Sequence, residues 1–64
     1  MKVRIYKVNS GFVRIEDINP FTIRASARKD DNFDADGWVL VGVFGTTYIK
    51  EYDIINYIEN HVEI

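Results

Sequence analysis

The sequence predicts a mainly β fold with one C-terminal helix, in the order β-β-β-β-β-α, folded as a small curled antiparallel sheet or a partly open barrel. Three observations predict it. Apolar and polar residues alternate with a period of two over much of residues 2–28, residues 38–44 form an apolar run, and the period becomes helical after Asp53. A chain of 64 residues is expected to form a single domain, residues 1–64.

The first two expected strands, residues 2–8 and 12–17, form a hairpin. Val3 and Ile5 alternate with polar residues in the first strand, and Val13 and Ile15 do so in the second. Between the strands lies Asn-Ser-Gly, in which Gly11 can adopt the left-handed conformation of a three-residue hairpin loop.

The third expected strand, residues 21–28, follows the turn signal Asn19-Pro20. Its odd-numbered residues are apolar, whereas its even-numbered residues are Thr, Ser and Arg. The strand therefore has one apolar and one polar face. Residues 25–29 could instead begin a helical turn, because Ala and Arg favour helices.

Residues 38–44 are apolar on both faces, which is typical of a central, doubly buried strand. Trp38 is expected to anchor the core at its start and Val41 to lie within the core. Gly42 indicates a bulge or a close backbone contact. A turn at Gly45-Thr46 then leads to a fifth strand over residues 47–50.

A C-terminal helix is expected over residues 54–61, with Asp53 as its N-cap. Ile54, Ile58 and Val62 lie along one helical stripe that would pack on the sheet.

Composition excludes several classes of protein. The chain has no Cys and one His, so it cannot form disulfides and lacks the ligands of a structural zinc site. No signal peptide and no apolar run of about 20 residues is visible, which favours a cytoplasmic protein without membrane association. The net charge is −2, but residues 1–29 contain seven basic and two acidic residues, and residues 30–64 contain one basic and eight acidic residues.

Two surfaces are candidates for binding. Exposed tyrosines beside acidic groups are common at protein interfaces; here they are Tyr48, Tyr52, Tyr57, Glu51 and Asp53. Arginines near aromatic rings on a sheet face are common in nucleic-acid-binding barrels; here they are Arg4, Tyr6, Arg14, Arg24 and Arg28, expected to share one face. Glu16 on that face can also pair with an arginine and reduce its net attraction for phosphate.

Asn32, Asp34, Asp36 and Gly37 match the start of a calcium-binding loop. The bidentate Glu that such a loop requires is replaced by Val43, so these residues are a weak calcium candidate and a solvated loop is favoured. No catalytic constellation is visible, since His61 is the only His and no nucleophile is paired with it. We therefore expect no enzyme activity, no catalytic residues and no cofactor.

The sequence thus favours a small, non-catalytic protein-binding module whose partner is another protein or a second copy of the chain. A narrower version is an accessory or inhibitor protein of phage or mobile-element type. The alternative is a nucleic-acid-binding domain that uses the arginine-rich face.

Overall fold

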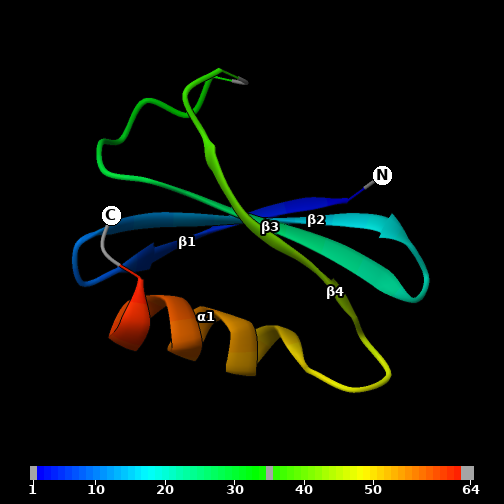
Figure 1. Ribbon diagram of the computed structural model, residues 1–64. Coiled ribbons are helices and arrows are strands. Elements are labelled where there is room, and N and C mark those ends of the chain that lie inside the picture. The colour runs from blue at the N-terminus through cyan, green and yellow to red at the C-terminus, as the bar shows by residue number, and fades with distance from the viewer. Residues whose placement is uncertain (1, 35, 63–64) are drawn as a thin grey trace.

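Four antiparallel strands form one open sheet, and a single helix lies on one side of it (Figure 1). The computed structural model describes residues 2–34 and 36–62. The strands lie side by side in sequence order and are followed by the helix: β1 (Val3–Val8), β2 (Gly11–Asn19), β3 (Thr22–Arg28), β4 (Val39–Gly45) and α1 (Glu51–His61). The predicted mainly β fold with a C-terminal helix is confirmed, but the sheet has four strands and not five.

The predicted fifth strand is replaced by a turn. The backbone N–H groups of Tyr48 and Ile49 donate to the carbonyl of Gly45, at 3.2 and 3.3 Å. These bonds redirect the chain into α1, which begins at Glu51, three residues earlier than predicted. The N-cap is Lys50, and the carboxylate of Asp53 accepts a hydrogen bond from the Lys50 backbone N–H at 3.4 Å. Asp53 therefore stabilises the helix start from its first turn.

The β1–β2 hairpin has a two-residue loop, because Val8 pairs with Gly11 and only Asn9 and Ser10 lie between them. The predicted three-residue loop with a left-handed Gly11 is wrong, since Gly11 belongs to β2 and has no positive φ. Glycine is needed there for close packing: a Cβ atom would lie 2.3 Å from the carbonyl oxygen of Arg28.

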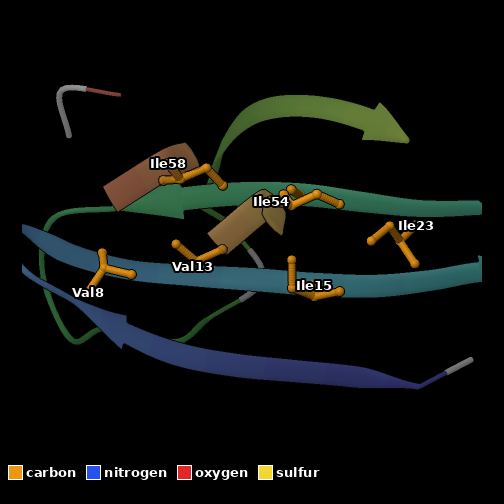
Figure 2. Close-up of a cluster of buried hydrophobic side chains, with 7 residues drawn as sticks. Val8, Val13, Ile15, Ile23, Ile54 and Ile58 are labelled. Atoms are coloured by element: carbon orange, nitrogen blue, oxygen red, sulfur yellow. The ribbon is translucent and has the colours of Figure 1, made fainter. Parts of the chain in front are cut away.

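The hydrophobic core lies between the sheet and α1. Val13 and Ile15 of β2 point toward Ile54 and Ile58 of α1 (Figure 2), and each of these four side chains is at most 1% exposed. Burial of one such side chain contributes about 1.5–3 kcal/mol. Because an isolated helix of 11 residues is only marginally stable, α1 depends on this packing. Val8, Ile23 and Ala25 complete the buried cluster.

β4 is an edge strand, which corrects the prediction of a central, doubly buried one. Val39, Leu40 and Val43 are 69%, 59% and 55% exposed. Val41, expected in the core, is only half-buried at its border. The expected bulge is present, because the pairing shifts by one residue between Leu40 and Gly42.

We predict that Ile58→Ala lowers the free energy of unfolding by about 2–4 kcal/mol, because it leaves a cavity in the centre of the core. Tyr52→Ala on the same helix is the control; its side chain is 77% exposed, so its effect should stay within about 0.5 kcal/mol. Urea denaturation of both variants checks this. Equal effects of the two substitutions would contradict the packing of α1 on β2.

Candidate binding surface

The sheet face opposite α1 is called the open face here. Residues alternate between the two faces along each strand, and the register aligns those of neighbouring strands. The open face therefore carries Val3, Ile5, Lys7, Phe12, Arg14, Glu16, Arg24, Ser26, Arg28, Leu40 and Val43.

Glu16 lies at the centre of the open face and is only 2% exposed. Arg24 donates to both of its carboxylate oxygens, from Nε to Oε1 at 3.0 Å and from Nη2 to Oε2 at 2.8 Å. Arg14 donates from Nη2 to Oε2 at 3.3 Å. The hydrogen bonds from Arg24, with the nearby charge of Arg14, hold the pKa of Glu16 below its usual value although burial opposes this. The carboxylate thus offsets one of the two positive charges of Arg14 and Arg24.

An aromatic cluster covers one end of the open face. The Trp38 ring lies 5.8 Å from the Arg14 guanidinium carbon and 5.4 Å from that of Arg28, in cation–π contact with both. Phe33 stacks on Trp38 with ring centroids 6.3 Å apart, and Phe12 meets Phe33 edge to face at 5.0 Å. Trp38 is therefore half-buried on the open face and does not anchor a central strand.

Arg28 holds the segment between β3 and β4, which lies on the side of the sheet away from α1 (Figure 1). Its Nε donates to Asp30 Oδ1 at 2.9 Å, and its Nη1 donates to the carbonyl of Asp36 at 2.9 Å. Gly37 has a left-handed φ of 93°, and a Cβ atom there would lie 2.9 Å from Arg28 Nη2. The Arg28 side chain thus has a structural role and is mostly buried.

Arg4 and Tyr6 lie on the other face of the sheet, beside α1, because Arg4 pairs with Ile15 and Tyr6 with Val13. Their prediction as part of one arginine face is wrong. Arg4 donates to Asp17 at 2.8 and 3.0 Å and to Glu51 at 2.6 Å. The Tyr6 hydroxyl donates to Glu51 at 3.1 Å. Burial, followed by the hydrogen bond to Glu51, raises the Tyr6 pKa.

The five residues of the predicted tyrosine surface differ in their contacts within the fold. Glu51 binds Arg4 and Tyr6, and Asp53 caps the helix. Tyr57 packs against His61, with ring centroids 5.1 Å apart. All three tyrosines are exposed: Tyr48 at 94%, Tyr52 at 77% and Tyr57 at 52%.

Hydrogen bonds between side chains and backbone N–H groups stabilise the acidic segment between β3 and β4. Asp30 accepts a hydrogen bond from the backbone N–H of Asn32, and Asn32 accepts one from that of Asp34, each at 3.1 Å. These bonds are typical of Asx turns. Within residues 2–34 and 36–62, no group of three His, Cys, Asp or Glu side chains is placed to hold a metal ion.

An apolar groove of about 870 Å³ separates β4 from α1. Val39, Val41 and Phe44 line one wall, and Ile49, Ile54 and Val62 contribute to the other. Leu40 and Arg28 also line this groove, which therefore reaches the edge of the open face at one end of β4. β4 thus has apolar surface on both sides.

The chain is thus a small antiparallel meander with a helix on one face and an arginine–carboxylate network on the other. Comparisons with known protein families, with curated proteins and with solved structures find no match to it. None of the helices in the described part is long and apolar enough to cross a membrane.

Sequence reasoning missed the roles of Phe12 and Phe33 at the open face. Phe33 lies in an acidic segment without periodicity, so no pattern indicated that it would stack on Trp38. Because Glu16 and Arg14 lie two residues apart in one strand, the sequence predicted that Glu16 could pair with an arginine. It did not predict that Glu16 would be almost completely buried.

We predict that Glu16→Gln lowers the free energy of unfolding by about 1–2 kcal/mol at neutral pH, because it removes charge-assisted hydrogen bonds. Folding lowers the pKa of Glu16 from about 4.5, so its stabilisation is fully present above that pH and is lost as the pH falls through the folded-state pKa. The difference between wild type and variant should therefore shrink in acid.

Urea denaturation at neutral and acid pH measures this difference. Asp31→Asn, in the exposed acidic segment, is the control and should leave stability nearly unchanged at neutral pH. A deficit of Glu16→Gln that stays constant into strong acid would contradict the ionised network.

Proposed function

We propose that this chain is a non-catalytic protein-binding module whose open face docks on another protein. The observation that carries the proposal is the pattern of exposure on this face. Val3 and Ile5 along β1 are 42% and 39% exposed, and Leu40 and Val43 along β4 are 59% and 55% exposed. These aliphatic side chains flank the central Glu16 network on both sides.

The centre of the open face is suited to being covered. Every buried side-chain N or O atom in the described part has a hydrogen-bond partner, so covering Glu16 would leave no unpaired carboxylate. Removing an unpaired charge from water is costly, whereas the Glu16 carboxylate is already paired with two guanidinium groups. Arginine and aromatic residues are also enriched in the energetically important centres of interfaces.

The charge of the open face favours a partner that carries carboxylates around an apolar patch. Four basic residues, Lys7, Arg14, Arg24 and Arg28, lie on this face, and Glu16 and the adjoining Asp30 form ion pairs with three of them. The Arg24 side chain is 43% exposed and so can meet an acidic group at the rim. Such complementarity favours specificity and fast association.

An accessory or inhibitory role agrees with this mode of action. A domain of this size that covers a surface of its partner can block that surface without any chemistry of its own.

Nucleic-acid binding is favoured less by this geometry. All four arginines of the chain form ion pairs with carboxylates: Arg4 with Asp17 and Glu51, Arg14 and Arg24 with Glu16, and Arg28 with Asp30. Phosphates would have to compete with these carboxylates, and Arg4 lies on the other face.

We predict that Ile5→Ser/Leu40→Ser weakens partner binding by roughly tenfold or more, since both side chains would be buried in the interface. Tyr48→Ser/Tyr52→Ser is the matched control and should bind as the wild type does. Partners are isolated with the tagged wild-type protein, purified, and titrated against both variants by calorimetry. Loss of binding in the tyrosine variant alone would place the interface at the start of α1 and overturn the proposal.

Labelled single-stranded and duplex oligonucleotides, titrated at low and moderate salt, should show no tight binding in fluorescence anisotropy. This is expected because the guanidinium groups of Arg14 and Arg24 already form ion pairs with the Glu16 carboxylate. Affinity that falls steeply with salt, the signature of phosphate contacts, would instead favour the nucleic-acid alternative.

A further inference from the structure

The two edge strands of the sheet differ in charge. An edge strand exposes backbone N–H and C=O groups, and charged side chains are a common protection against unwanted pairing. β1 carries Arg4 and Lys7, whereas β4, with the sequence Val-Leu-Val-Gly-Val-Phe-Gly, has no charged or polar side chain. One edge is thus protected and the other is suited to pairing.

The backbone of β4 presents hydrogen-bonding groups at this edge. The Thr46 N–H donates to the carbonyl of Phe21 at 2.9 Å, so Thr46 faces β3. Successive residues of an antiparallel strand alternate in direction, and therefore Val43 and Gly45 direct their backbone groups away from β3. A second observation supports this direction for Gly45, because its carbonyl accepts hydrogen bonds from the backbone N–H groups of Tyr48 and Ile49, which lie outside β3.

We propose that β4 pairs antiparallel with β4 of a second copy of the chain, around a two-fold axis at Val43, to form one continuous eight-stranded sheet. Two hydrogen bonds would join the Val43 backbones, N–H of each to C=O of the other. In this register Gly42 of each copy faces Phe44 of the other, and the Phe44 ring of its own chain also lies over Gly42. This inference is independent of the proposed function, and it would place two open faces side by side.

The occupant is a second copy because β4 is compatible with itself. Self-pairing brings no like charges together, whereas self-pairing of β1 would crowd Arg4 and Lys7 of two chains. Apolar side chains near the axis would gain cover, Phe44 on the groove side and Val43 on the open face. The bulge between Leu40 and Gly42 limits the length of pairing, so the dimer is expected to be concentration-dependent.

Charge reversal at the axis tests the proposal. Val43→Lys and Val43→Glu place like charges opposite each other, and each should weaken the dimer at least about tenfold. An equimolar mixture of the two should recover the dimer, because Lys then faces Glu. Val43 is 55% exposed, so both variants should keep the circular dichroism spectrum of the wild type. Val3→Lys, on the same face of β1, is the matched control and should dimerise normally.

Sedimentation velocity from micromolar to millimolar protein gives the result. A wild-type dimer that is lost in each Val43 variant and restored in their mixture supports the pairing. A wild-type monomer throughout this range, or a dimer unaffected by Val43→Lys, overturns it. The test separates the two proposals, because Ile5→Ser/Leu40→Ser should still dimerise even though it loses its partner protein.

Discussion

The carboxylate of Glu16 determines the character of the sheet face that α1 leaves uncovered. β2 alternates strictly, so Val13 and Ile15 join the core on one side and Glu16 faces Arg14 and Arg24 on the other. Without this carboxylate the two guanidinium groups would form a strongly basic patch suited to phosphate. With it, half of this positive charge is neutralised and the buried polar atoms at the centre of the face are hydrogen-bonded. The side chains exposed on either side of the centre are aliphatic.

Two ion pairs join the basic first half of the chain to its acidic second half. Arg4 in β1 binds Glu51 at the start of α1, and Arg28 binds Asp30 in the segment that follows β3. The first pair ties the helix to the sheet, and the second holds the segment that carries Phe33 and Trp38. The guanidinium groups of Arg4 and Arg28 therefore position structural elements of the fold.

Much of the fold could be predicted from local pattern, but the relation between strands could not. Alternation with a period of two predicted β2 and β3, and the helical period predicted the end of α1. The apolar run of β4, by contrast, is the same whether its faces are buried or exposed. The length of the β1–β2 loop decides on which face of the sheet each β1 side chain lies, and the predicted loop was one residue too long. A three-residue loop would have aligned Arg4 with Glu16 and Tyr6 with Arg14, whereas the two-residue loop aligns them with Ile15 and Val13. For this reason the predicted arginine face lost Arg4 and Tyr6 but kept Arg14, Arg24 and Arg28.

The pKa of the Glu16 carboxyl, followed by ¹³C NMR of its side chain during a pH titration, tests the central interaction most directly. The arginine–carboxylate network predicts a midpoint below the ordinary value of about 4.5, because Arg24 and Arg14 stabilise the ionised form. A midpoint at or above that value would contradict the network. Arg14 and Arg24 would then lack their counter-charge, and the open face would have the basic character expected of a nucleic-acid-binding surface.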